Sequence, residues 1–290
     1  MASVFDVSRA GYYKFINKKE SQRTQKNRDL IVSIKSVYSE NRGIYGSPRI
    51  HAVLNKNGKK CSRKHVAKLM QINKIQAKSR KKWKVSGKSC RDITKIAPNL
   101  INRNFTAPAP NQVWVSDITY IRTNEGWLYV AAIMDIFSRR IVGLCMSNRM
   151  DTTLINKAYN QAICHRSPAT GLILHSDRGV QYTSYEYKNI TGAQGALLSM
   201  SNRGNCYDNA AMESFFHTLK TEHVYFNKYK TRQEAANSIF EYIEVFYNRR
   251  RIHSTLNYLS PLEFEQKFES SRVKLARPAI EVNKLSVHCV

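Results

Sequence analysis

The hydrophobic period of this chain changes near residues 106–110, and this change restricts the folds that the chain can adopt. Before Pro108 and Pro110, apolar residues recur at helical spacing, as they do between residues 20 and 40. After them, residues 113–122 alternate and are rich in β-branched and aromatic side chains, which is the pattern of a strand. Because proline cannot continue a helix or a central strand, we expect a helical front part and a separate α/β part.

The charge of the chain divides at nearly the same place. The 290 residues include 47 Lys and Arg against 21 Asp and Glu, a net charge of +26. Residues 1–104 hold 26 of these cations and 5 of these acids, a net of +21, which leaves +5 for residues 105–290. A surface that serves only solubility does not need such a bias in one segment. The front part is therefore predicted to bind a polyanion, of which nucleic acid is the usual one.

Two short helices are predicted in the basic front part. Ser47 can cap a helix that starts at Pro48 and stops at Gly58, and Ser62 can cap a second helix that ends near Ile72. Two short helices joined by a Gly-containing turn, the second rich in cations, are typical of a helix-turn-helix. A plain helical hairpin with a solvated basic face is the alternative. The cations assigned to DNA contact are Arg49, Arg63, Lys64 and Lys68.

The back part is predicted to be a mixed sheet with helices packed against it. Strands are expected over 113–122, 127–134, 140–146, 172–176 and 196–199, and helices over 154–164, 184–191, 209–225 and 232–247. The predicted organisation is a helical segment (1–45), a helix-turn-helix region (46–85), a linker (86–109), a catalytic core (110–268) and a tail (269–290).

Cysteine spacing and hydropathy predict a cytoplasmic protein. The six cysteines form no C-x-x-C pair, and their irregular spacing is typical of reduced thiols rather than of a zinc site. The N-terminus lacks a basic segment followed by an apolar core, so no signal peptide is expected. The longest apolar run, Leu128–Met134, is too short to span a bilayer, so no membrane association is expected.

Three carboxylates stand where chemistry is expected. Asp117 interrupts a strand of β-forming residues, which is locally unfavourable and therefore marks a candidate functional site. Asp177 ends a short buried strand and lies near a Gly, at the rim where ligands of α/β sheets gather. Glu213 lies on a helix, and Asn209 and Lys220 share its face. For each carboxylate taken alone, a solvated residue or a helix-capping group is the alternative interpretation.

Convergence of these carboxylates at one rim would favour divalent cations. Three carboxylates left alone repel one another and raise each other's pKa. Two cations roughly 3.5–4 Å apart would relieve this repulsion and activate the attacking and leaving oxygens of a phosphodiester. Hard oxygen ligands favour Mg²⁺ or Mn²⁺ over zinc. We therefore expect Asp117, Asp177 and Glu213 to bind two such ions.

Long motifs of the chain resemble a known family. Residues 203–222 (RGNCYDNAAMESFFHTLKTE), 114–120 and 175–184 resemble the transposases of the "insertion sequence three" family, second-frame product (OrfB). The 35 residues between Asp177 and Glu213 are similar to the D,D(35)E pattern of retroviral integrases and these transposases. Residues 45–50, 247–256 and 260–264 resemble other segments of the family. The resemblance extends from about Ser8 to about Phe268 without a departure at the acidic positions.

The resemblance implies an activity, a fold and partners. It implies a ribonuclease H-like core whose Asp117, Asp177 and Glu213 are the metal-binding catalytic triad, and strand cleavage followed by strand transfer into target DNA. Lys220 matches a family residue thought to touch DNA, although an ordinary exposed lysine is the alternative. Further implied features are an upstream-frame OrfA protein fused by frameshifting, a homo-oligomer on DNA and association with the nucleoid.

The roles of three further polar residues, and two alternative functions, are not decided by the sequence. Asp135 matches no position of the triad and is interpreted as a turn residue. His175 either assists the site or is a structural histidine, and Asn209 is expected to support the site rather than bind metal. The alternatives to a transposase are a non-catalytic DNA-binding regulator of transposition and a nuclease of the same fold that cuts but never joins.

Overall fold

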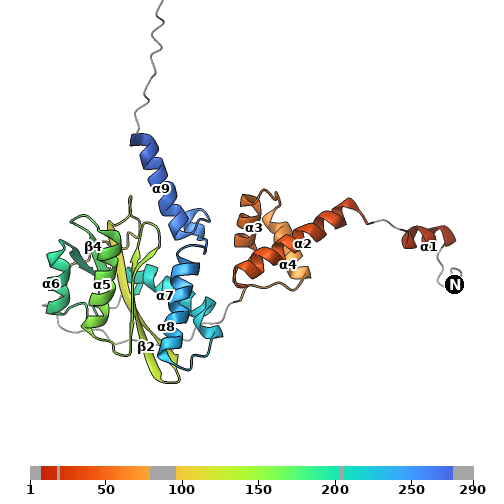
Figure 1. Ribbon diagram of the computed structural model, residues 1–290. Helices are drawn as coiled ribbons and strands as arrows, with labels where there is room; N and C mark the ends of the chain where they lie inside the picture. The colour runs from red at the N-terminus through yellow and green to blue at the C-terminus, as the bar shows by residue number, and fades with distance from the viewer. Residues whose placement is uncertain (1–7, 18–19, 79–95, 203–205, 277–290) are drawn as a thin grey trace, which may run out of the picture. The chain divides into compact units, whose positions relative to one another are not determined.

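The computed structural model describes residues 8–17, 20–78, 96–202 and 206–276. The chain divides into two compact units, Met1–Ser79 and Arg80–Val290 (Figure 1). The predicted boundary at residue 85 and residues 86–95 of the predicted linker lie outside the described residues, as does the basic run 80–84. The first unit is helical, whereas the second is built on a sheet, as the change in hydrophobic period predicts.

Four helices make up the described part of the first unit. They are α1 (Arg9–Ile16), α2 (Gln22–Glu40), α3 (Ser47–Lys56) and α4 (Arg63–Ile72). The last three pack on one another. The buried apolar side chains of this unit include Ile34, Val37, Tyr45, Ile50, Leu54, Val66, Leu69 and Met70. The period-3.6 pattern of the sequence thus predicts which side of each of these three helices is inward.

One predicted helix cap is present and the other is not. Ser62 caps α4, because its side chain accepts a hydrogen bond from the N–H of His65 at 3.2 Å. Helix α3 starts one residue earlier than predicted, with Gly46 at the cap position and Ser47 already helical. The Ser47 hydroxyl makes no cap hydrogen bond. Pro48 still falls in the first turn, where its missing N–H has no helical partner to lose.

The second unit contains a five-stranded sheet of order β3-β2-β1-β4-β5. Its strands are β1 (Val113–Thr123), β2 (Gly126–Asp135), β3 (Ile141–Ser147), β4 (Ile173–Ser176) and β5 (Leu197–Met200). The β1–β2 and β2–β3 pairs are antiparallel, whereas β4 pairs in parallel with β1 and with β5. All five predicted strands are therefore present, in the mixed sheet that was expected.

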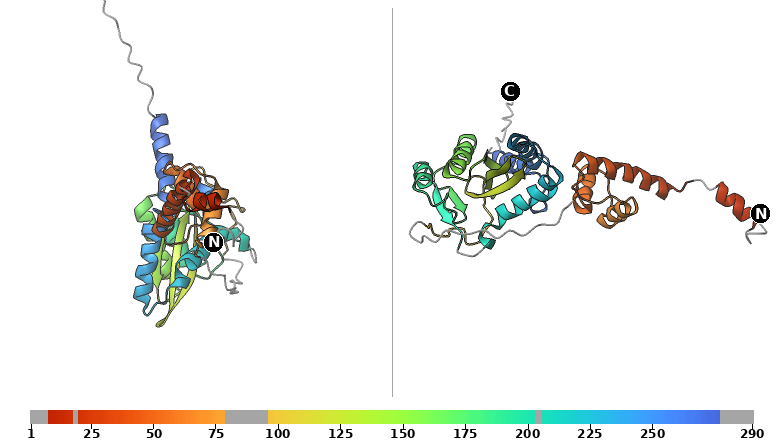
Figure 2. Two further views of the ribbon diagram at one scale, coloured as in Figure 1. Left: turned by 90° about the vertical axis from the view of Figure 1, so that its right-hand side faces the viewer. Right: turned by 90° about the horizontal axis from the view of Figure 1, so that it is seen from below.

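Helices cover both faces of this sheet (Figures 1 and 2). Helices α5 (Thr152–Arg166) and α6 (Tyr185–Ala193) pack on one side, and α7 (Ala210–Glu222) and α8 (Arg232–Glu241) on the other. The predicted helix over 209–225 ends at Glu222, and the one over 232–247 passes into a π-helix. The remaining elements are the 3₁₀ turns η2 (Cys206–Asn209), η3 (Val224–Phe226) and η5 (Ser254–Leu256), the π-helix η4 (Tyr242–Tyr247) and α9 (Pro261–Ala276).

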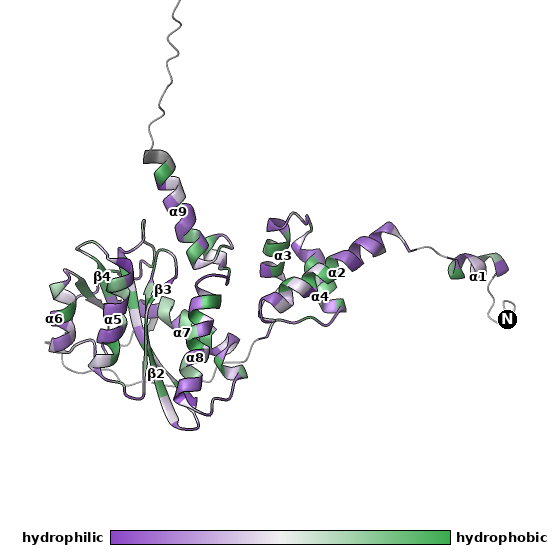
Figure 3. Cartoon of the chain, in the orientation of Figure 1, coloured by the Kyte–Doolittle hydropathy of each residue, from purple (hydrophilic) through white to green (hydrophobic). Residues whose placement is uncertain are grey.

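The main core lies between the sheet and α5 and α6, where the strands are predominantly apolar (Figure 3). Trp114 and Ile133 of the sheet pack in one cluster with Tyr159 of α5 and with Tyr182, all almost fully buried. Gly143 of β3 permits the close approach of α5, because a Cβ there would lie 2.3 Å from the carbonyl oxygen of Ala158.

Asp135 begins the β2–β3 turn, as predicted, because its carbonyl oxygen accepts a hydrogen bond from the N–H of Arg139 at 2.8 Å, but it also belongs to the sheet. It is the last residue of β2, opposite Trp114, and it is fully buried. Its carboxylate accepts hydrogen bonds from the N–H groups of Asn111 (2.8 Å) and Phe137 (3.0 Å) and pairs with Arg166 at 3.3 Å. Asp135 thus joins the C-terminal end of β2 to Asn111 and Arg166. Both partners are distant from Asp135 in the sequence, so residue spacing could not predict these contacts.

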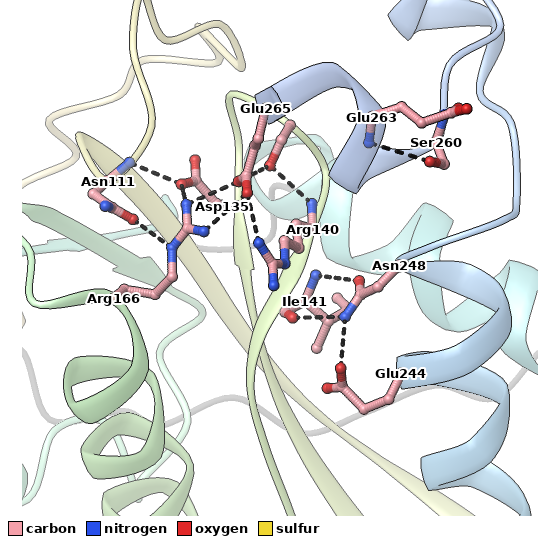
Figure 4. A network of polar contacts seen from close by, with 11 residues as sticks. Asn111, Asp135, Arg140, Ile141, Arg166, Glu244, Asn248, Ser260, Glu263 and Glu265 are labelled. Carbon is pink, nitrogen blue, oxygen red and sulfur yellow. Dashed lines mark hydrogen bonds and ion pairs between the residues drawn. The ribbon is translucent and has the colours of Figure 1, made fainter. Parts of the chain in front are cut away.

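Glu265 extends this buried network from α9 (Figure 4). Its carboxylate accepts hydrogen bonds from Ser138 at 2.7 Å, Arg140 at 2.7 Å and Arg166 at 2.8 and 2.9 Å. The network joins the β2–β3 turn, the end of α5 and the first turns of α9. Sequence patterns did not predict α9, and the predicted boundary at residue 268 falls inside this helix.

Two other sequence expectations concern cysteines and membranes. Cys61, Cys145 and Cys164 are free thiols, which agrees with the expectation for those three. In the stretches of chain that the structure describes, no helix combines the length and the apolar character needed to cross a membrane.

Candidate catalytic site

The register of β1 and β4 places Asp117 beside Asp177. Val115 pairs with His175 in the parallel β1–β4 ladder, so two further steps bring Asp117 level with Asp177. Asp177 directly follows Ser176, the last residue of β4, as the predicted strand over 172–176 implies. Since neighbouring strands lie roughly 4.8 Å apart, the two carboxylates emerge next to each other at one rim of the sheet.

Local hydrogen bonds orient both aspartates. The Oδ1 atom of Asp117 accepts a hydrogen bond from the N–H of Ile118 at 2.8 Å, and that of Asp177 accepts one from the N–H of Gly179 at 2.9 Å. In the described part of the chain, the Oδ2 atom of each aspartate accepts no hydrogen bond. One oxygen of each carboxylate is therefore held and the other is available to a ligand.

Helix α7 brings Glu213 to the same rim. This helix packs on β1, and Asn209 at its cap position donates a hydrogen bond to the carbonyl oxygen of Ser116 at 3.3 Å. Asn209 thereby joins the start of α7 to the residue next to Asp117. Its own Oδ1 atom is buried and has no partner within the described residues. Glu213 lies one turn further along and is exposed.

The pKa of Asp117 shows that the three carboxylates share one electrostatic environment. Burial raises the pKa of Asp117 to about 8, and the charges of Asp177 and Glu213 add to this effect. The N–H of Ile118 and the charge of Lys220 lower the pKa, but by less. Desolvation also raises the pKa of Asp177, although part of that residue reaches solvent.

The carboxylates nevertheless do not form a closed cage. Within the described ranges, no three His, Cys, Asp or Glu side chains stand close enough together to hold a metal ion as they are. The structure therefore brings Asp117, Asp177 and Glu213 to one rim without assembling their oxygens around a point.

The other residues predicted near the site take distinct places. Lys220 lies two turns beyond Glu213, and its Nζ atom is 5.1 Å from the centroid of the Tyr120 ring. His175 is fully buried, and its ring nitrogens form hydrogen bonds with Ser199 (2.8 Å) and Ser201 (3.2 Å). Burial lowers the pKa of His175 to about 4, so its environment is that of a neutral structural histidine.

Sequence reasoning missed a second polar link beneath the site. The hydroxyl groups of Ser116 and Tyr182 form a buried hydrogen bond of 2.9 Å, which ties β1 to the segment that follows Asp177. Ser116 thus contacts both of the other segments that carry the candidate carboxylates, because its carbonyl oxygen binds Asn209. Both residues lie inside the motifs 114–120 and 175–184, but no spacing rule indicates that their hydroxyl groups meet.

In the first unit, the predicted DNA-contacting cations lie on the second and third helices of the packed trio. Arg63, Lys64 and Lys68 of α4 are exposed. Arg49 of α3 is half-buried, and its guanidinium lies 5.5 Å from the centroid of the Tyr45 ring. Arg49 therefore differs from the three cations of α4, because its guanidinium packs on an aromatic ring of its own unit rather than being fully exposed.

Models of known families match most of the chain. An HTH-like domain matches residues 24–83, and an integrase core domain matches residues 107–206 and, in a second model, residues 213–268. The two core matches contain the five strands, helices α5, α6 and α8, and all of α7 except its first three residues. The fold and the site thus define an integrase-type core, with a ribonuclease H-like mixed sheet, preceded by a helix-turn-helix region, as predicted.

Relatives that align with nearly the full length of this chain identify its family within the integrase-type proteins. An uncharacterized 31 kDa protein of insertion element IS600 from Shigella sonnei is 43% identical over 268 residues, 92% of this chain and 98% of that protein. The InsF transposase of IS3A from Escherichia coli K12 is 36% identical over 269 residues, 92% of this chain and 93% of InsF. The chain belongs to the IS3 family of insertion-sequence transposases.

A solved structure also shows a likeness. The catalytic core domain of BIV integrase aligns with 56% of this chain and 99% of its own length, with 16% sequence identity and a TM-score of 0.43.

Proposed function

We propose that this transposase cleaves DNA at the ends of an insertion sequence and transfers the strands to target DNA, with Asp117, Asp177 and Glu213 as catalytic residues. The supporting observation is that β1, β4 and α7, which are distant in sequence, bring these three carboxylates into one electrostatic environment. Membership of the IS3 family makes strand transfer the expected reaction.

The donor set at this rim suits two Mg²⁺ or Mn²⁺ ions. All three side chains offer hard oxygen atoms, each aspartate has one oxygen with no hydrogen bond from the described residues, and Glu213 is exposed. Burial and, to a smaller extent, the negative charges of Asp177 and Glu213 raise the pKa of Asp117, and a bound cation would favour its charged form. When bound, such ions would activate the attacking oxygen and stabilise the leaving oxygen of a phosphodiester.

The remaining residues act by holding DNA. We expect Lys220 to bind a phosphate beside the carboxylates, and the exposed cations of α4 to bind the backbone of a transposon end. No covalent link between protein and DNA is needed, because each displacement is made by a water or a 3′-hydroxyl that the site orients. Fusion with an upstream-frame OrfA protein and a homo-oligomer on DNA stay predictions.

A strand-transfer assay separates this proposal from its alternatives. The full chain is given a pre-nicked transposon end and target DNA, in Mg²⁺ and again in EDTA. Joined product that requires Mg²⁺ supports a transposase. Cleavage without joining would indicate a nuclease, and binding without cleavage would indicate a regulator of transposition.

The carboxylate rim predicts that the metal-free protein loses stability as pH rises. Folded Asp117 holds its proton up to about pH 8, whereas the pKa of an unperturbed Asp is 3.8. Because the folded state binds the extra proton, its contribution to stability is full below about pH 4 and is lost as pH approaches 8. We expect urea midpoints in EDTA to fall over this range, and Mg²⁺ to reverse the fall at the upper end.

The variant Asp117→Asn should remove part of this pH dependence, because Asn cannot titrate. The matched control is Glu269→Gln, which changes an exposed carboxylate of α9 in the same unit and should retain the dependence. An equal slope in Asp117→Asn and in the wild type would contradict the assignment of the shift to Asp117.

The exposed cations of α4 predict a salt-dependent grip on DNA. Alanine at Arg63, Lys64 or Lys68 should weaken binding and lower the slope of log K against log salt by roughly 0.9 for each phosphate that the variant no longer neutralises. Fluorescence anisotropy over a range of salt concentrations measures this slope. Lys35→Ala, an exposed lysine of α2, is the control and should change it less. Unchanged slopes in all three α4 variants would remove this helix from the interface.

A further inference from the structure

Two large aromatic side chains lie together and exposed on the β1–β2 hairpin. The ring centroids of Tyr120 and Trp127 are 5.0 Å apart and the rings meet edge to face at 81°. Their residues are 37% and 44% exposed. The strand register puts both on the same face of the hairpin, since Tyr120 pairs with Tyr129 and Trp127 pairs with Arg122. We call Tyr120 and Trp127 the aromatic shelf.

The aromatic shelf lies a short distance along β1 from Asp117, and Lys220 is a neighbour of both. Tyr120 lies three residues beyond Asp117 in β1, a step of roughly 10 Å, and because side chains alternate along a strand the two point to opposite faces of the sheet. The Nζ atom of Lys220 is 5.1 Å from the centroid of the Tyr120 ring, and the same ammonium lowers the pKa of Asp117. Arg122, opposite Trp127, is exposed. Positive charge therefore lies on either side of the rings.

The hairpin that carries the aromatic shelf is held firmly to the start of α8. Arg232 donates hydrogen bonds to the carbonyl oxygens of Trp127 (3.0 Å) and Glu125 (2.6 Å), and its own N–H binds the Glu125 carboxylate at 2.8 Å. Asn124 donates a further backbone hydrogen bond to Tyr229 at 3.1 Å. Anchoring of this kind fixes the backbone of the hairpin before any ligand arrives, which lowers the entropy lost on binding.

We propose that the aromatic shelf stacks an unpaired base at the end of the DNA substrate, while Arg122 and Lys220 bind the adjoining phosphates. Every nucleobase offers a π-face to an aromatic ring, and the phosphates of nucleic acid complement the positive charge beside the shelf. An apolar peptide would not complement the positive charge of the exposed Arg122. The inference rests on the proposed function, because it specifies where the DNA end lies relative to the three carboxylates.

The experiment measures stacking without any need for chemistry. The full chain is mixed, in EDTA, with a duplex that has a short single-stranded extension and 2-aminopurine at its first unpaired position, or with the blunt duplex of the same sequence. In the wild type we expect quenched 2-aminopurine fluorescence and tighter binding of the extended duplex. Trp127→Leu should lose roughly tenfold in affinity for the extended duplex and little for the blunt one, together with the quenching.

Two further variants separate stacking from bulk and from folding. Trp127→Phe keeps an aromatic face and should retain most of the quenching and of the preference for the extension. Phe240→Leu removes a ring that is 50% exposed on α8 and should behave as the wild type. Urea midpoints of all variants identify any that fail to fold, and Tyr120→Leu then provides a second test of the shelf.

The outcomes distinguish this proposal from the proposed function. If Trp127→Leu and Tyr120→Leu fold and retain both the quenching and the preference for the extension, the shelf does not stack bases, even where the wild type joins strands in Mg²⁺. A change in oligomeric state without a change in quenching would also overturn the proposal, because it would make the shelf a protein contact. A wild type that never joins strands would refute the proposed function, while the stacking result would still stand.

Discussion

Asp117→Asn, Asp177→Asn and Glu213→Gln are each expected to lower the rate of strand transfer by roughly a thousandfold or more, with DNA binding nearly unchanged. Each variant removes a negative charge and an anionic oxygen ligand from the rim while it keeps the shape of the side chain. The loss of several kcal/mol of transition-state stabilisation by a bound cation corresponds to this factor. DNA binding should persist because the basic first unit is untouched.

The measurement is the rate of joined product from a pre-nicked end in Mg²⁺, together with the Kd for the same DNA. Glu269→Gln is the matched control for Glu213→Gln, since both residues are exposed glutamates on helices of the same unit. It should join strands at the rate of the wild type. Joining that survives in any of the three variants would exclude that residue from the catalytic set.

Glu265→Leu is expected to lower the free energy of unfolding by roughly 3–5 kcal/mol. The Glu265 side chain is 4% exposed, and its partner Arg166 is 13% exposed. Removal of the carboxylate leaves the guanidinium of Arg166 with only the more distant Asp135, at 3.3 Å, as an ionic partner in the described part of the chain. Burial of a charge without sufficient compensation is among the costliest changes that a fold can accommodate.

Urea unfolding measures this loss, and Glu269→Gln on the same helix should change stability little. Burial alone would raise the pKa of Glu265, but the hydrogen bonds and charge of Arg166, with Ser138 and Arg140, hold it below its usual value. Its contribution is therefore present above the unfolded pKa, near 4.5, and is lost as pH falls through the lower folded value. The gap between wild type and Glu265→Leu should narrow in acid. A gap that is small at neutral pH, or that widens in acid, would contradict the role of the ion pairs.

Much of the fold follows from local patterns. Strand β1 is predicted from its alternating β-branched and aromatic residues, and α4 from its apolar period and from Ser62 at its start. These features depend on residues close together in sequence, so the physical cause of each is visible in a short window. The candidate carboxylates can also be identified from their local sequence. Asp117 is a charged residue among β-forming residues, and Glu213 lies within a long family motif.

Other features have no local cause. Asp135 follows a run of strand formers, and only its partners Asn111 and Arg166 explain why a carboxylate can be buried at that strand end. Helix α9 has a weak apolar pattern, and Glu265, which joins it to the sheet, looks like a surface residue in the sequence. The hydrogen bond between Ser116 and Tyr182 joins residues that are 66 positions apart.

The amino-acid order alone therefore specifies the type and succession of most elements, the division into a basic helical unit and an α/β unit, and the side chains available for chemistry. Which of these side chains meet depends on the assembled fold. The parallel register of β1 and β4 sets Asp117 beside Asp177, and the packing of α7 on β1 adds Glu213. Periodicity reflects interactions along one element, whereas register and packing require several elements to be buried and hydrogen-bonded at the same time.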